Sequence, residues 1–194
     1  MKWSGPADSS HVVVFAPGDE GRIDDAHLSC VVSGLSAAGV RVVCFDSPGG
    51  EDSAARDQRM AGMIRDAADA CGAATLVLGG LSRGARVSVG LAQELGAAAL
   101  VLFAYPFHSR RSPDVGSRVH DLASVSGPVW LGQGSRDALG NQPQVVGYRL
   151  PTHVHIHWLA DANHALRPRP SSGFTMEGQL SEASSLAAAF VLRS

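Results

Sequence analysis

The stretch from Val77 to Gly90, VLGGLSRGARVSVG, joins an apolar run, a serine with a glycine two residues to either side, and an apolar-periodic segment. An apolar run followed by a helical pattern predicts a strand, a tight turn and a helix. Ser82 would lie at the corner, where Gly80 and Gly84 complete a G-x-S-x-G pattern. In this pattern small neighbours let strand and helix approach closely while the serine hydroxyl stays exposed. Alone, the same letters also fit a plain turn, because the chain contains 22 glycines.

Two kinds of phosphate-binding loop use glycine at such corners, and the sequence fits neither. A dinucleotide fingerprint needs glycine at positions 79, 81 and 84, but position 81 is Leu81. A Walker A loop needs lysine directly after Gly84, and that residue is Ala85. Both alternatives are therefore excluded.

Six short runs rich in β-branched residues recur along the chain, and most are apolar on both faces: 11–16, 40–45, 74–79, 98–104, 127–132 and 153–159. Continuous hydrophobicity is typical of parallel strands that helices cover on both sides. Helical patterns lie between or after these runs, at 28–35, 55–71, 83–95 and 175–192. The alternation predicts an α/β fold with a doubly wound, six-stranded, mostly parallel sheet in the order 2-1-3-4-5-6.

Length and charge exclude several classes of protein. With 194 residues, of which 45% are hydrophobic, we expect a single domain over 1–194. The 16 basic and 18 acidic residues give a net charge of −2, and no long run of one sign occurs, so we expect no nucleic-acid or membrane partner. Lys2 is the only lysine, and a flexible terminal residue is unsuited to lysine-nucleophile chemistry.

The cysteines and the first residues indicate a cytoplasmic protein. Three cysteines lie in apolar segments without C-x-x-C spacing, which is typical of reduced, buried side chains: Cys30, Cys44 and Cys71. No apolar run approaches the roughly 18 residues that span a bilayer. Residues 1–15 also lack the apolar centre of a secretory signal.

An acid and a histidine follow Ser82 in the order that a Ser-Asp-His triad requires. Asp137 follows the fifth predicted strand and His164 follows the sixth, each in a loop. A histidine can accept the serine proton when a carboxylate holds its other ring nitrogen. Alone, Asp137 would more simply be a turn residue and His164 a helix cap. Together with Ser82, the ordered set predicts a triad.

A triad that transfers acyl groups also needs donors for the oxyanion. One candidate is the backbone N–H of Arg83, the residue after the serine. The others lie in the loop after the first strand, at Gly18 and Asp19. With the predicted strand order, this loop and the Ser82 corner face each other across the point where the chain order reverses.

With Ser82, Asp137 and His164 placed, the chain resembles the α/β-hydrolase superfamily. More narrowly, it is similar to a small dienelactone-hydrolase-like group that includes testis-expressed α/β-hydrolase-like proteins and a subunit of the nonspecific-lethal chromatin complex. The likeness covers almost the full length and rests on four segments: LVLGGLSRGARVS, LVLFAYPFH, WLGQGSRDALG and HWLADANHALRP. The resemblance implies a minimal α/β-hydrolase fold without the two leading antiparallel strands of larger hydrolases.

One feature departs from that group. Its members usually carry His-Gly at the turn after the first strand, where this chain has Pro17 and Gly18, followed by Asp19 and Glu20. A negative side chain near the oxyanion opposes charge build-up unless it points away.

Residues 107–122, in which larger hydrolases insert a cap, are too few for a cap domain. We expect Tyr105 and Phe107 in the pocket wall, together with His108. Arginines here would line the rim and favour a carboxylate-bearing substrate, although loop arginines are more often solvated: Arg110, Arg111 and Arg118.

The run HVHIHW places His153, His155 and His157 on one face of a strand. Two of them have the spacing of zinc ligands. The solvent face of an edge strand is the simpler interpretation, because no motif supplies a third ligand, and we expect no metal site.

The sequence thus predicts a serine hydrolase that cleaves an ester or thioester of a small or acyl substrate through an acyl-enzyme, without cofactor. Two alternatives remain open. The same residues would serve as acid and base in a lyase or cyclase. Pro17 and the acidic Asp19-Glu20 pair are instead compatible with a non-catalytic interaction module.

Overall fold

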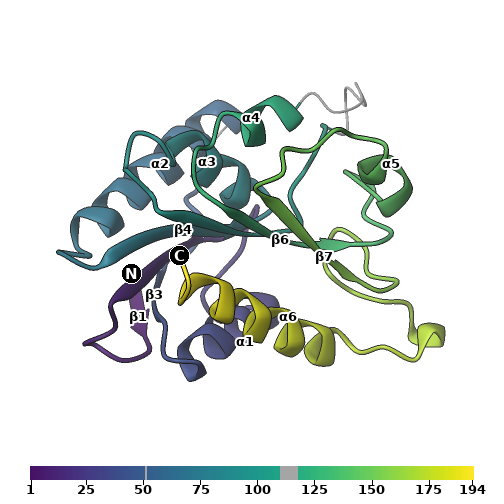
Figure 1. Cartoon of the computed structure of the whole chain (residues 1–194), viewed down its shortest axis with the longest axis horizontal. Coiled ribbons are helices and arrows are strands. Elements are labelled where there is room, and N and C mark those ends of the chain that lie inside the picture. Colours follow the sequence, from purple (N-terminus) through teal and green to yellow (C-terminus); the bar gives the residue numbers. More distant parts are fainter. Residues whose placement is uncertain (51, 110–117) are drawn as a thin grey trace.

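A seven-stranded sheet forms the centre of the molecule (Figure 1). The computed structural model describes residues 1–50, 52–109 and 118–194. The strands are β1 (Lys2–Ser4), β2 (His11–Ala16), β3 (Arg41–Cys44), β4 (Thr75–Leu81), β5 (Ala99–Phe103), β6 (Val129–Gly134) and β7 (Val154–Leu159). Their order is β1-β3-β2-β4-β5-β6-β7, and every neighbouring pair is parallel except β1 with β3. The six predicted strands, their order and the fold class are confirmed.

The predicted number of strands is wrong by one, because β1 adds a leading antiparallel strand at the sheet edge. Its three residues pair with β3, so that Trp3 lies opposite Val43. Most of β1 is exposed, and it therefore lacks the continuous apolar pattern by which the buried strands are recognised. The Arg41 guanidinium lies 4.4 Å from the centre of the Trp3 ring, a cation–π contact that holds the edge strand in place.

Helices cover both faces of the sheet. Helices α2 (Ser53–Asp69), α3 (Arg83–Leu91) and α4 (Val119–Ala123) lie on one face, and α1 (Ala26–Ala37) and α6 (Met176–Val191) on the other (Figure 1). Two short elements complete the described part, α5 (Gln142–Val146) and a 3₁₀ turn at Pro170–Ser172. Within the described residues, no helix combines the length and apolar character that a bilayer crossing requires.

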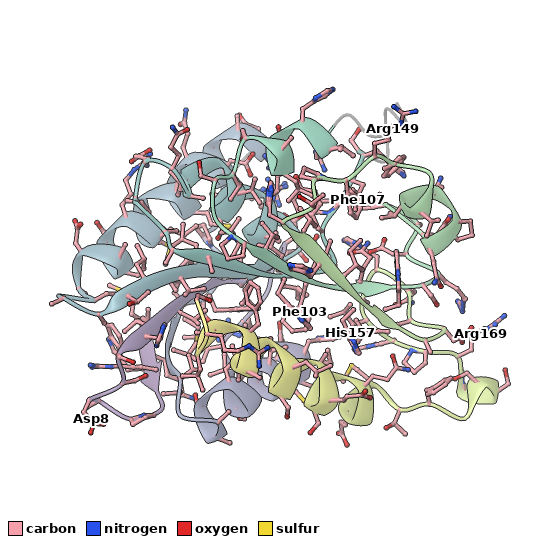
Figure 2. All side chains as sticks on the ribbon, viewed as in Figure 1. Asp8, Phe103, Phe107, Arg149, His157 and Arg169 are labelled. Atoms are coloured by element: carbon pink, nitrogen blue, oxygen red, sulfur yellow. The ribbon has the colours of Figure 1, made fainter. Side chains whose placement is uncertain are left out.

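The sheet side chains alternate between two cores, one on each face. Val12 and Val14 of β2 pack with α2 and α3, whereas Val13 and Phe15 pack with α1 and α6. Figure 2 shows the same division, with Phe107 and Phe103 on opposite sides of the sheet. Because helices exclude water from both faces of the sheet, the central strands have no polar face. This explains their continuous hydrophobicity.

Candidate active site

Ser82 is held in a strained conformation between β4 and α3. Its φ is 53° and its ψ is −108°, a combination that costs a residue with a side chain about 1–3 kcal/mol. The Ser82 N–H donates to the carbonyl of Phe103 over 2.9 Å and ties the turn to β5. Although Ser82 directly precedes the helix, its hydroxyl makes no capping hydrogen bond, which leaves it available for another partner.

Backbone crowding explains both glycines of the pattern. A Cβ on Gly80 would lie 2.6 Å from the carbonyl carbon of Gly84. A Cβ on Gly84 would overlap the carbonyl oxygens of Ala16 and Pro17. The backbone of helix α3 therefore packs directly against β4 and the end of β2. The G-x-S-x-G corner requires this close approach, whereas a plain turn does not.

Ser82, His164 and Asp137 form one continuous chain of hydrogen bonds. Ser82 Oγ lies 2.8 Å from His164 Nε2. His164 Nδ1 lies 2.9 Å and 2.8 Å from the two carboxylate oxygens of Asp137. The Asp137 carboxylate is fully buried, and the backbone N–H of Leu139 donates to it over 2.8 Å. In this geometry Nδ1–H donates to the acid, and Nε2 is free to accept the hydroxyl proton.

The loop after β2 lies against the Ser82 corner, as predicted. A Cβ built on Gly18 would be 3.7 Å from Ser82 Cβ. Arg83 is the first residue of α3, so its N–H has no acceptor within the helix. The loop around Gly18 and the N-terminus of α3 thus both lie beside the serine.

The Asp19 carboxylate is neutralised by arginines. Asp19 Oδ1 lies 2.5 Å from Arg83 Nε and 3.5 Å from Arg56 Nη1. The Asp19 side chain, which the sequence alone would set against an oxyanion, is therefore directed at the Arg83 guanidinium of helix α3. Glu20 is exposed and lines the cavity beside it.

Arg83 also joins this loop to α2. Its Nη1 lies 2.5 Å from Asp57 Oδ1, and Arg86 Nη2 lies 2.5 Å from Asp57 Oδ2. Burial disfavours the charged carboxylate of Asp57, but hydrogen bonds from Arg86 and then Arg83 outweigh it and lower the pKa of Asp57. Arg83 thus bridges the loop after β2 and helix α2 in a single ion-pair network.

A cavity of about 650 Å³ opens beside Ser82 and His164. Its lining includes His108, as expected, but not Tyr105 or Phe107. Those two are fully buried and pack edge to face, with ring centres 5.2 Å apart. Their assignment to the pocket wall is wrong, because side chains alternate along this segment: positions 105 and 107 face the core, whereas Pro106 and His108 face the cavity.

Arg118 lines the cavity, whereas Arg110 and Arg111 lie outside the described residues. Arg118 Nη1 donates to the carbonyl oxygen of Pro106 over 3.0 Å. Burial and the neighbouring charge of Arg86 lower the pKa of Arg118.

Two of the three histidines at the last strand make structural contacts, and His155 is exposed. His157 stacks on Trp130 with ring centres 5.9 Å apart, and His153 Nε2 lies 3.2 Å from the Leu122 carbonyl oxygen. Across the described ranges, no three His, Cys, Asp or Glu side chains are grouped in a way that would hold a metal ion.

The sequence analysis missed two residues near the site. His27 lines the cavity, and burial, together with the charge of Arg167, lowers its pKa. Gln133 on β6 donates to Asp137 over 3.0 Å. The only available signal was that Gln133 precedes Asp137 by four residues, and no spacing rule links an amide in a strand to an acid in the following turn.

Comparisons with known proteins agree with the fold. The chain belongs to the family of alpha/beta hydrolase domains, which it matches over residues 9–192. The expected enzyme class, an α/β-hydrolase, is thereby confirmed. No curated protein sequence matches the chain significantly.

Solved structures show the same fold at low sequence identity. A serine hydrolase homologue from Coxiella burnetii is 18% identical, with a TM-score of 0.70 over 97% of this chain and 89% of its own. The esterase domain of a Rhodothermus marinus protein is 15% identical, with a TM-score of 0.73 over 98% and 91%. Est1E from Butyrivibrio proteoclasticus, solved with ferulic acid, is 13% identical, with a TM-score of 0.74 over 100% and 95%.

Gly84→Ala is expected to destabilise the protein by about 1–3 kcal/mol, because the added methyl group overlaps backbone that cannot move independently. Gly90→Ala in the same helix is the matched control. A Cβ there meets nothing within 4 Å, so this change should stabilise by about 0.5–1 kcal/mol. Urea denaturation of both variants measures the difference, and equal effects would contradict the crowding argument.

Asp57→Asn is expected to lower the free energy of unfolding at pH 7 by about 1 kcal/mol, since partial exposure screens the ion pairs. The pKa of Asp57 is lowered in the folded protein, so its stabilisation exists above the usual carboxyl range and is lost as the pH falls below about 4. Urea denaturation at pH 7, 5 and 3 should show the variant and wild type converging. Asp66→Asn, exposed on the same helix, is the control, and a difference independent of pH would contradict the assignment.

Proposed function

We propose that this protein is a serine hydrolase that cleaves an ester or thioester of a small or acyl substrate. The observation that carries the proposal is the chain of hydrogen bonds from Ser82 Oγ through His164 to the buried Asp137. We also propose membership of the dienelactone-hydrolase-like group with the testis-expressed proteins, a single domain over 1–194 and a cytoplasmic location.

The reaction begins when His164 Nε2 takes the proton of the Ser82 hydroxyl as Oγ attacks the substrate carbonyl carbon. Asp137 stabilises the resulting imidazolium and keeps Nε2 directed at the serine. The tetrahedral intermediate collapses, and His164 gives the proton to the leaving alcohol or thiol. A water molecule then attacks the acyl-enzyme with His164 as base, and Ser82 is released. These steps need no metal or organic cofactor.

The oxyanion accepts hydrogen bonds from the N–H groups of Arg83 and the Gly18-Asp19 loop. A single donor of this kind contributes about 10²–10³-fold to kcat. Because Arg83 binds the Asp19 carboxylate, the Asp19 side chain does not present an unpaired negative charge to the oxyanion. This pairing removes the Asp19 charge as a reason for preferring a non-catalytic module.

The cavity fits a small-molecule substrate. Its volume of about 650 Å³ lies within the range of small-ligand sites, about 300–1,000 Å³. His108 and Arg118 supply polar groups on its wall.

A fluorophosphonate probe should label the wild-type protein at Ser82, because the probe reacts with a serine that a histidine has activated. Ser82→Ala should abolish labelling, and intact-mass spectrometry with peptide mapping measures both. Ser88→Ala is a control for a buried serine of the same helix, whose hydroxyl donates to the Gly79 carbonyl. Equal labelling of wild type and Ser82→Ala would contradict the proposal.

Product analysis in ¹⁸O-labelled water separates hydrolysis from a lyase or cyclase step. Hydrolysis should place one ¹⁸O atom in the released carboxylic acid, because water attacks the acyl carbon. Turnover without incorporation would favour the non-hydrolytic alternative.

Arg83→Met is expected to lower kcat by about tenfold or more, because it leaves the Asp19 carboxylate beside the developing oxyanion with only the longer contact to Arg56. The double variant Arg83→Met/Asp19→Asn should recover part of this loss. Steady-state kinetics on a p-nitrophenyl ester measure the kcat of each variant. Arg65→Met is the control, because Arg65 on α2 forms a surface ion pair with Glu94 in the turn after α3. Absence of recovery would show that the Asp19 charge is not the cause.

A further inference from the structure

The Asp137 carboxylate has no contact with solvent, so its oxygens accept hydrogen bonds only from the protein donors around it. Both Asp137 oxygens accept a hydrogen bond from His164 Nδ1, and the backbone N–H of Leu139 donates to Oδ1. Oδ2 accepts a further hydrogen bond from Gln133 Nε2 over 3.0 Å. A buried carboxylate is stable only when such donors replace water.

Gln133 is itself fully buried on β6, and its amide nitrogen is surrounded by acceptors. Besides Asp137, the carbonyl oxygens of Gly140 and Tyr105 lie 3.1 Å and 3.3 Å from Nε2. These acceptors fix the orientation of the amide, because a flipped amide would place Oε1 against two carbonyls and a carboxylate.

The other end of the Gln133 amide is unsatisfied. Within the described part of the chain, Oε1 is buried and has no hydrogen-bond partner. An unpaired buried acceptor is unfavourable for stability. The residue is therefore poorly explained by stability alone, whereas its NH₂ group faces the acid and two carbonyl oxygens.

We propose that Gln133 is a positioning residue that holds the Asp137 carboxylate directed at His164. The inference rests on the proposed function, since it assigns Gln133 an effect on catalysis through Asp137. An amide suits this place because it donates a hydrogen bond without a net charge. A cation would compete with the His164 imidazolium for the carboxylate.

The link from Gln133 to Tyr105 and Gly140 also joins the acid to two chain segments. Tyr105 follows β5, and Gly140 ends the turn that carries Asp137. One amide thus holds the turn of the acid against the neighbouring strand end.

The test uses Gln133→Met and Gln133→Glu in the full chain, with p-nitrophenyl acetate as probe. Gln133→Met keeps the length of the side chain but donates nothing, so kcat should fall about 10- to 100-fold while KM stays within about twofold of wild type. Gln133→Glu can donate a hydrogen bond only while its carboxyl is protonated. Once ionised, this carboxyl would face Asp137 and two carbonyl oxygens with no proton to donate. Its kcat should exceed that of Gln133→Met near pH 6 and fall towards that of Gln133→Met as the pH rises to 9.

Gln179 provides a matched control. It is a buried glutamine on α6 whose Nε2 donates to the Ala160 carbonyl over 2.8 Å and whose Oε1 also has no partner among the described residues. Gln179→Met and Gln179→Glu should change thermal stability without altering the kcat or the shape of the pH profile. A structural role of Gln133 would make the two pairs of variants behave alike.

The outcomes separate this inference from the proposed function. An active wild type with Gln133→Met within twofold of it, and a wild-type pH profile for Gln133→Glu, would overturn the role of Gln133 alone. If Gln133→Met does not fold, the pH profile of Gln133→Glu decides. A wild type that neither turns over the ester nor reacts with a fluorophosphonate at Ser82 would overturn both proposals.

Discussion

The close approach of helix α3 to the ends of β2 and β4 is the constraint on which the site depends. Gly80 and Gly84 remove the side chains that would keep these backbones apart. The chain can then turn from strand to helix only through a strained residue, and Ser82 occupies that position with a φ of 53°. Strain of this kind persists only where surrounding structure fixes it. Here the tightly packed sheet and helix do so.

The same approach brings the loop after β2 beside the serine, and ion pairs then hold it there. Arg83 follows Ser82 directly and binds Asp19 from the loop and Asp57 from α2. An acidic residue that looked unfavourable for an oxyanion in the sequence is thus half of an ion pair in the fold. Its charge is balanced by the arginine next to the proposed nucleophile, so Asp19 and the hydrolase chemistry are compatible.

Local patterns predicted much of the fold and of the candidate site. Buried parallel strands have no polar face, so their runs are continuous and easy to recognise. The order of Ser82, Asp137 and His164, each after a strand, also appears in the sequence, and these side chains meet because the carboxyl ends of parallel strands share one edge of the sheet. The edge strand β1 was missed since it is short and mostly exposed.

The sequence by itself determined the α/β class, the strand order and the three loops that carry the polar groups, because each depends on neighbouring residues and on general rules of chain topology. Only the tertiary structure decided where individual side chains point. It turned Tyr105 and Phe107 into the core, aimed Asp19 at Arg83, and placed the Gln133 amide against Asp137. These directions depend on packing and charge between segments far apart in the chain, and no local pattern encodes them.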